Sequence, residues 1–399
     1  MSGRKRVALV LAGGAARGAY EVGVIEHVLV EVAAAIKRPV RFDILCGTSV
    51  GAMNACALAA WAHEGAAVTE RLTRVWTGLE LEKLVRTDLR ALLPSLRAGS
   101  AVPPRESGVL DPKGLEELVA QSIPFERIDE NLAQGFVDAV TVSTTHVQSG
   151  RTVVFVQTAS GLLPPWSLDP TIEPRAAKIR AQHALASAAI PILFRSVRID
   201  GEYHCDGGLR QNVPLSPARR LGADAVLVIN PRVLPTPPLA ARDPAVEEAF
   251  PGPLFLIGKT LNALMLDRID TDLARLESVN RILEAGTRAF GPGFVSELNR
   301  ALGHDGHGFR PLRAMLVRAS QDIGRIAADF VRAHGASLRG FTGRLIRRLA
   351  TSEGGDPNES DLLSYLLFDG RFARELVELG RADARARHDE LCAFFDDLG

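Results

Sequence analysis

The stretch FDILCGTSVGAMNA, residues 42–55, places a serine between two glycines where a short apolar run meets an alanine-rich run. The pattern predicts a β-strand, a sharp turn and a helix, with Gly-x-Ser-x-Gly at the turn. Ser49 at such a corner adopts strained backbone angles, and Gly47 and Gly51 lack the Cβ atoms that would collide where the chain doubles back. The new helix points its free N–H groups at the Ser49 hydroxyl. The stretch therefore predicts a reactive serine on a nucleophile elbow.

The composition excludes several classes of protein. Of the 399 residues 46% are apolar, enough for one large α/β domain or two smaller ones. Lys+Arg and Asp+Glu number 47 each, so no net charge indicates a nucleic-acid partner. The 4 cysteines are scattered, which is typical of reduced thiols in a cytoplasmic protein and argues against a structural zinc site. Because Val7–Leu11 is too short for a signal peptide and no apolar run approaches about 18 residues, we expect no transmembrane segment.

A second glycine-rich turn, Gly13–Gly18, follows the first predicted strand and precedes a helix that runs to about Ile36. Backbone N–H groups at such a junction form a cradle for an anion. A dinucleotide fingerprint is one interpretation, but Ala15 replaces its third glycine and Asp43 is the only acid in the region where the ribose ligand belongs. A purely structural turn is another. We favour a cradle for an oxyanion rather than for a phosphate.

A third feature lies much later in the chain, where two short predicted strands around Asp200-Gly201 deliver Asp206 onto a Gly-Gly turn. Asp-Gly is a common hairpin pair, so Asp206 alone would indicate only turn chemistry. His204 could share a strand face with Asp206, and His183 lies on the helix expected before it. A Ser-His-Asp triad is therefore an alternative to direct pairing of serine and aspartate.

These three features, occurring together and in order, resemble the patatin-like phospholipase family of bacterial type. The segment Ala186–Pro191 adds to the resemblance, which covers Val7 to about Asn230 and continues more weakly through 313–320 and 364–370. The resemblance implies an α/β fold of three layers, α/β/α, with a central, mostly parallel sheet and a nucleophile elbow. It also implies a C-terminal helical elaboration of that fold.

By the same resemblance, Ser49 is the nucleophile, Asp206 its general base, and the N–H groups around Gly13, Gly14 and Ala15 form the oxyanion hole. Arg17 either anchors this turn or adds positive charge near the oxyanion. The family usually has a further glycine where this chain has Ala15, so the backbone there must suit a residue with a Cβ. The family pattern has no catalytic histidine, and we therefore expect a Ser-Asp dyad that needs no cofactor and no metal.

The expected function is hydrolysis of fatty-acyl esters of phospholipids or lysophospholipids through an acyl-enzyme. Alternatives on the same site are an acyltransferase, a neutral-glyceride lipase or esterase, and a non-catalytic lipid-binding module. The expected partner is a lipid or fatty-acyl ester and no nucleic acid. Head group, chain length, positional preference, activator and oligomeric state are not readable from the residues.

The remaining chain is divided by its composition. We expect a surface loop at 89–112, which could cover the site, a helix at 175–189, and a proline-rich connector at about 231–253. Helical spacing returns at 254–285, 325–349 and 361–395. Residues 1–330 are expected to form the catalytic domain, with 331–399 as a helical extension packed on it.

The segment 325–348 combines an apolar stripe with six arginines and a single acid. Gly335 and Gly340 are expected to interrupt the helix. One interpretation is that the stripe packs on the core and the arginines are solvated or pair with the acidic C-terminal helices. The other is an interfacial surface for anionic lipid. We accordingly expect a cytoplasmic protein, with peripheral contact at the inner membrane surface under the second interpretation.

Overall fold

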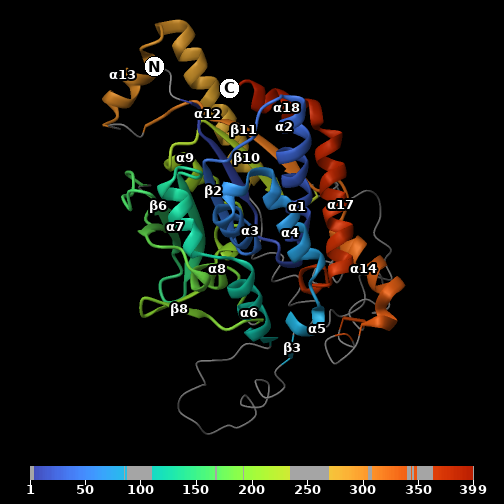
Figure 1. The fold of residues 1–399 in the computed structure, drawn as a ribbon. Helices are drawn as coiled ribbons and strands as arrows, with labels where there is room; N and C mark the ends of the chain where they lie inside the picture. Colours follow the sequence, from blue (N-terminus) through green and yellow to red (C-terminus); the bar gives the residue numbers. More distant parts are fainter. Residues whose placement is uncertain are drawn as a thin grey trace, which may run out of the picture.

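The computed structural model describes residues 4–84, 86–87, 110–166, 169–191, 193–233, 269–303, 308–338, 343, 346–347 and 363–398. Figure 1 shows helices on both sides of a twisted central sheet. Nearly all of the loop expected at 89–112 and of the connector expected at 231–253 lies outside the described residues, as do 254–268.

The sheet has nine strands in the described part, and seven of them follow the order β11-β10-β1-β2-β5-β6-β7. The five strands from β11 to β5 are parallel: β11 Arg313–Arg318, β10 Ala225–Asn230, β1 Val7–Leu11, β2 Ile44–Thr48 and β5 Ala139–His146. Their short, continuous apolar runs suit strands that are covered on both faces. The expected mixed α/β fold with a mostly parallel sheet is confirmed.

Four further strands extend the sheet around β5: β6 Thr152–Thr158, β7 Ile172–Ala176, β8 Val197–Ile199 and β9 Glu202–Asp206. β6 pairs antiparallel with β5, and β7 pairs parallel with β6. β8 and β9 form the hairpin predicted around Asp200-Gly201, in which these two residues adopt positive φ of 49° and 90°. β9 also pairs with the end of β5. A separate two-stranded sheet joins β3 Arg86–Thr87 to β4 Leu110–Asp111.

The two faces of the sheet bury separate clusters of side chains. Leu9 and Leu11 of β1 point into one cluster, whereas Ala8 and Val10 point into the other. Helices on the first face are α1 Gly18–His27, α3 Val50–Ala60, α4 Val68–Thr77, α6 Lys113–Ser122, α7 Glu126–Ala133, α8 Ala181–Ser187, α14 Ile323–His334, α17 Gly370–Ala386 and α18 His388–Asp396. The second face is covered by α9 Leu215–Arg220 and the first turns of α12 Ile269–Phe290, which continues into α13 Phe294–Ala301.

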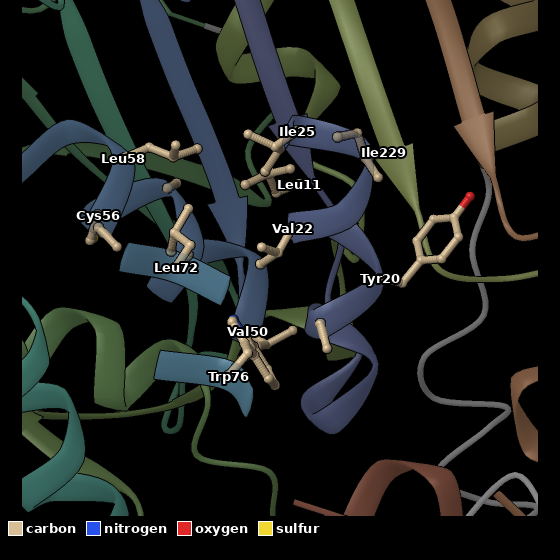
Figure 2. Packing of buried hydrophobic residues seen from close by; sticks show 14 of the residues in the cluster. Leu11, Tyr20, Val22, Ile25, Val50, Cys56, Leu58, Leu72, Trp76 and Ile229 are labelled. Carbon is tan, nitrogen blue, oxygen red and sulfur yellow. The ribbon is translucent and has the colours of Figure 1, made fainter. Parts of the chain in front are cut away.

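The larger cluster fills the space between the sheet and the helices of the first face. Figure 2 shows Leu11 and Ile229 from the strands, Val22 and Ile25 from α1, and Val50 from α3 gathered there. α3 is buried on nearly every side, because its alanines let the sheet and the surrounding helices approach closely. This central position holds the start of α3, and thus Ser49, rigidly.

The C-terminal helices pack directly on the N-terminal half. α1 and α17 run side by side in Figure 1. A Cβ on Gly23 of α1 would overlap the carbonyl oxygen of Val377, and a Cβ on Gly380 of α17 would overlap that of Tyr20. The two backbones therefore touch where both helices have glycine. The domain boundary expected at residue 330 stays a prediction.

The helix predicted at 175–189 is wrong in its first half, because 175–176 belong to β7 at the edge of the sheet and α8 begins only at Ala181. An edge strand tolerates Pro174, which cannot donate to a ladder. The strand β11 has no counterpart among the strands expected from the sequence. Of the region predicted as helical from 254 to 285, the described part, 269–285, lies in α12, which continues to Phe290.

The stripe in 325–348 contacts the core where the structure describes it. Phe330, Val331, Leu338 and Ile346 lie in the larger cluster, and α14 ends at His334 before a short turn that begins at Gly335. These side chains favour the packing interpretation; Arg344 and Arg348 lie outside the described residues. Within the described ranges, no helix combines the length and apolar content that crossing a bilayer requires.

The contact between α1 and α17 can be tested by adding one methyl group. We expect Gly23→Ala to lower the free energy of unfolding by about 1–3 kcal/mol, because the new Cβ must displace backbone atoms of α17. The matched control is Gly293→Ala, where a Cβ would meet nothing within 4 Å. Urea unfolding measures both. Equal stability of the two variants would contradict a close backbone contact.

Candidate active site

Ser49 occupies the corner between β2 and α3 in a backbone conformation that is rare for a residue with a side chain. Its φ is 54° and its ψ is −125°, which costs on the order of 1–3 kcal/mol. A Cβ on Gly47 would overlap the carbonyl of Gly51, and a Cβ on Gly51 would overlap that of Leu11. Both glycines are therefore required by close approach of the backbone, as the Gly-x-Ser-x-Gly pattern predicts.

The hydroxyl of Ser49 donates a hydrogen bond of 2.7 Å to Oδ2 of Asp206. Strand register brings these residues together: Thr48 lies beside Ser143 in the pair β2–β5, and Thr144 lies beside Asp206 in the pair β5–β9. The last residue of β9 is thus delivered to the end of β2. Ser49 and Asp206 are respectively 1% and 0% exposed.

Asp206 is held at both its carboxylate and its backbone. Oδ1 accepts the N–H of Gly208 at 2.7 Å, and the Asp206 N–H donates to the carbonyl of Ala189 at 2.9 Å. Burial raises the pKa of Asp206 to about 7, although the hydrogen bonds from Ser49 and Gly208 oppose the rise. A carboxylate with a pKa near neutrality accepts a proton far more readily than an ordinary aspartate.

Ser187 supports the elbow from the end of α8. Its Oγ accepts the N–H of Ser49 at 2.8 Å and donates to the carbonyl of Ser143 at 2.6 Å. The strained serine is therefore tied to the neighbouring strand through a buried hydroxyl. The sequence analysis uses the segment around Ser187 only for its family resemblance and assigns this serine no role. The alanine-rich residues around Ser187 do not indicate that its hydroxyl supports the elbow.

The glycine-rich turn lies against the serine, because a Cβ on Gly13 would come within 3.3 Å of the Ser49 Cβ. The Gly13 N–H donates to the carbonyl of Asn212 at 3.1 Å. Among the described residues, the N–H groups of Gly14 and Ala15 have no acceptor. Ala15 has a φ of 48°, a conformation that glycine adopts at lower cost. The N–H groups of Gly14 and Ala15 are thus free to donate to an oxyanion. The Gly13 N–H could do so only by giving up its hydrogen bond to the Asn212 carbonyl.

Arg17 anchors this turn to the C-terminal part of the chain. Its side chain is 4% exposed, and its Nε donates to the Ser364 hydroxyl at 2.8 Å. The guanidinium lies 4.3 Å from the centre of the Tyr365 ring. Of the two roles that the sequence left open for Arg17, these contacts favour anchoring.

A buried polar network holds α1 against α3 and α4 near the elbow. Asn54 donates to the carbonyl of Gly18 at 3.1 Å and to Glu21 Oε2 at 2.8 Å, and it accepts from Trp76 Nε1 at 3.0 Å. Burial raises the pKa of Glu21 well above its ordinary value. Glu21 and Asn54 therefore join the helices that carry the turn and the elbow.

The two histidines considered as alternative bases are bonded elsewhere. His204 Nδ1 lies 3.1 Å from the Thr144 hydroxyl, and His183 Nδ1 accepts the N–H of Arg180 at 3.0 Å. Burial lowers the pKa of each to about 4. Both carboxylate oxygens of Asp206 are already occupied by Ser49 and Gly208. The structure brings serine and aspartate together without an intervening imidazole.

A narrow apolar cavity of about 60 Å³ begins beside the elbow. Val50 and Met53 of α3 line it together with Trp76 of α4 and Leu115 and Leu118 of α6. Val50, the residue after Ser49, therefore lines a cavity that is suited to a hydrocarbon chain. The fold and this site are those of an ester hydrolase.

The comparisons with known proteins agree with this class. The family model described as "Patatin-like phospholipase" matches residues 9–219, which is more than half of the chain and includes both Ser49 and Asp206. The chain belongs to the patatin-like phospholipase family. The fold and enzyme class expected from the sequence are thereby confirmed.

Two individual proteins show how far the similarity extends. A "cGAMP-activated phospholipase" of Pseudomonas aeruginosa is 30% identical over 210 residues, which are 52% of this chain and 53% of that protein. The chain thus spans about half the length of this curated relative. The crystal structure of VipD from Legionella pneumophila aligns over 94% of this chain and 67% of that chain, with 14% identity and a TM-score of 0.34. A similarity this low supports no conclusion about function.

The raised pKa of Asp206 predicts a cost in stability. Between about pH 4 and 7 the folded chain keeps a proton that an unfolded aspartate has released, so the free energy of unfolding falls as pH rises through this window. Asp206→Asn removes the effect. We therefore compare the free energy of unfolding of this variant with that of wild type at pH 4 and at pH 8. The difference, variant minus wild type, should be about 2–4 kcal/mol more favourable to the variant at pH 8 than at pH 4. Urea unfolding at both pH values checks this.

The control for that experiment is Asp329→Asn, which removes an exposed carboxylate of α14. A pH-independent difference between Asp206→Asn and wild type would mean that Asp206 ionises in the folded chain as it does in water.

Ser187→Ala tests the support of the elbow. Removing the hydroxyl leaves the Ser49 N–H and the Ser143 carbonyl buried without a partner, so we expect kcat to fall about tenfold with little change in KM. Ser160→Ala, on an exposed turn, is the matched control and should keep the wild-type kcat. Steady-state kinetics on a soluble acyl ester separates the two constants; an unchanged kcat for Ser187→Ala would contradict the assignment.

Proposed function

We propose that the chain is a serine lipid acyl hydrolase that cleaves fatty-acyl esters of phospholipids or lysophospholipids through a Ser49–Asp206 dyad. The observation that carries this proposal is the buried hydrogen bond of 2.7 Å from Ser49 Oγ to Asp206 Oδ2. Membership of the patatin-like phospholipase family supports the lipid substrate. The proposal includes a cytoplasmic enzyme that meets its substrate at a lipid surface.

In the first step Asp206 takes the proton of Ser49 Oγ as that oxygen attacks the ester carbonyl carbon. The negative charge that develops on the carbonyl oxygen is stabilised by the N–H groups of Gly14 and Ala15 and by the positive end of α3. When the tetrahedral intermediate collapses, the proton passes from Asp206 to the leaving alkoxide, and the acyl group remains on Ser49.

In the second step Asp206 takes a proton from water, whose oxygen attacks the acyl-enzyme. Collapse of this second intermediate returns the proton to Ser49 and releases the fatty acid. Because the same carboxylate must be ionised at the start of both steps, the pKa of about 7 implies that activity rises with pH through neutrality.

The apolar cavity next to Val50 supports an acyl chain as the group that Ser49 receives. At about 60 Å³ it has room for only a short stretch of hydrocarbon, since a cavity needs about 10–15 Å³ to hold one water molecule. Leu115 and Leu118 of α6 line it together with residues of α3 and α4.

The name of the relative from Pseudomonas aeruginosa also states an activator for that protein. Our proposal takes over only the hydrolysis, because the matched part of each chain is about half of its length. An acyltransferase or a neutral-glyceride lipase would use the same dyad, and product analysis distinguishes them.

Ser49→Ala should abolish hydrolysis of phosphatidylcholine and lysophosphatidylcholine while the fold persists, a loss on the order of 10⁶-fold in kcat for removal of a nucleophile. A fluorophosphonate probe should label wild type and not this variant. His204→Ala, with Asp206 left intact, should lose at most about tenfold. Liberated fatty acid measures turnover, and circular dichroism checks folding. Undiminished hydrolysis by folded Ser49→Ala would falsify the proposal.

A further inference from the structure

A large cavity lined by several charged side chains lies on the opposite face of the sheet from α3. Its volume is about 790 Å³, and its lining comes from α9, the start of α12 and the loop that leads from Asp206 to α9, among other segments. Five arginines line it: Arg210, Arg219, Arg220, Arg275 and Arg310. The described acids in its lining are Asp169 and Asp272. The cavity therefore carries an excess of positive charge in a chain whose net charge is zero.

Arg219 and Arg220 at the end of α9 are the centre of this charge. Among the described residues neither guanidinium has an acidic partner, and the Nε of Arg220 is buried without a hydrogen-bond partner. Burial together with the charges of Arg220 and Arg310 lowers the pKa of Arg219. Arg310 differs from these two arginines, because its guanidinium donates to the carbonyls of Arg219 and Ala223 and lies 3.6 Å from Oδ1 of Asp224. Adjacent, half-buried cations of this kind are stabilised by an anion.

Asn212 is a second, independent feature of the same cavity. The residue is 5% exposed and belongs to the lining. Within the described part of the chain, neither its Oδ1 nor its Nδ2 has a hydrogen-bond partner. A buried amide without partners costs free energy that a polar ligand can recover.

We propose that this cavity binds a phosphate-bearing anion through Arg219 and Arg220, with the Asn212 amide as a further contact. Guanidinium groups present paired N–H donors that match the oxygens of a phosphate. The cavity is larger than one phosphate requires and falls in the range of sites for drug-sized ligands. A ligand with more than one phosphate, or with a phosphate and a polar body, therefore fits better than an acyl chain.

Asn212 also connects this cavity to the catalytic loop. Its carbonyl accepts the Gly13 N–H at 3.1 Å. A Cβ on Gly13 would overlap its Oδ1, and a Cβ on Gly208 would come within 3.1 Å of the same atom. Asn212 therefore packs against both the oxyanion turn and the turn that follows Asp206. A ligand that engages its amide changes how Gly13 lies against Ser49, and so changes kcat more than KM; this consequence rests on the proposed function.

Binding is measured on the full-length Ser49→Ala variant, so that the result does not depend on hydrolysis. Isothermal titration with inorganic pyrophosphate should show saturable binding that weakens with salt. The double variant Arg219→Gln/Arg220→Gln should bind at least about tenfold more weakly. Arg325→Gln, an exposed arginine of α14, is the matched control and should bind as the parent does. Circular dichroism confirms the fold of each variant.

A lipid headgroup could supply the same phosphate chemistry as a free ligand. Co-sedimentation with phosphatidylcholine vesicles, with and without phosphatidate, separates the two sources. Loss of sedimentation in Arg219→Gln/Arg220→Gln supports a headgroup, and loss of pyrophosphate binding alone supports a free ligand. If the double variant does not fold, Arg220→Gln alone replaces it. Unchanged affinity for both probes in a folded variant overturns the site.

The coupling to catalysis is tested with Asn212→Leu, which keeps the side-chain volume and removes the amide. Pyrophosphate should change kcat of the wild type at least about twofold with little effect on KM, and should leave kcat of Asn212→Leu unchanged. Binding without any response of the wild-type kcat overturns the coupling and leaves the site. If the wild type cleaves no ester while binding persists, the proposed function fails and the site stands.

Discussion

The site depends on one buried hydrogen bond, from Ser49 Oγ to Asp206 Oδ2 at 2.7 Å. The serine is presented by a local turn, but the aspartate comes from a hairpin far along the chain. Only the shared neighbour β5 brings the two together, through its parallel pairing with β2 and its antiparallel pairing with β9. The central sheet is therefore also the part of the molecule that aligns Ser49 with Asp206.

Two features of this arrangement oppose folding. Ser49 adopts a positive φ of 54°, and Asp206 is fully buried with its pKa raised to about 7. Each is held by close packing around it: the glycines on either side of Ser49, the hydroxyl of Ser187, and the N–H of Gly208. Proteins commonly accept such local cost where a reactive group must be presented.

The C-terminal helices are part of the same structural unit as the site. Arg17, at the end of the glycine-rich turn 13–18, contacts Ser364 and Tyr365, while α17 touches α1 through paired glycines. On the other side of the sheet, Asn212 joins the turn at Gly13 to the arginine-lined cavity. The glycine-rich turn beside Ser49 thus receives contacts from both faces of the sheet.

The sequence by itself determined the elbow, because Gly47, Ser49 and Gly51 specify a strand-turn-helix through contacts that are local. It also indicated Asp206 and the glycine-rich turn, though only through their order and a family resemblance. Tertiary structure alone decided that Ser187 holds the elbow, that the Gly13 N–H is taken by Asn212, and that β7 and β11 are strands. These depend on strand register and on which backbones meet across the sheet, and such long-range pairing leaves no periodic signal in the residues that make it.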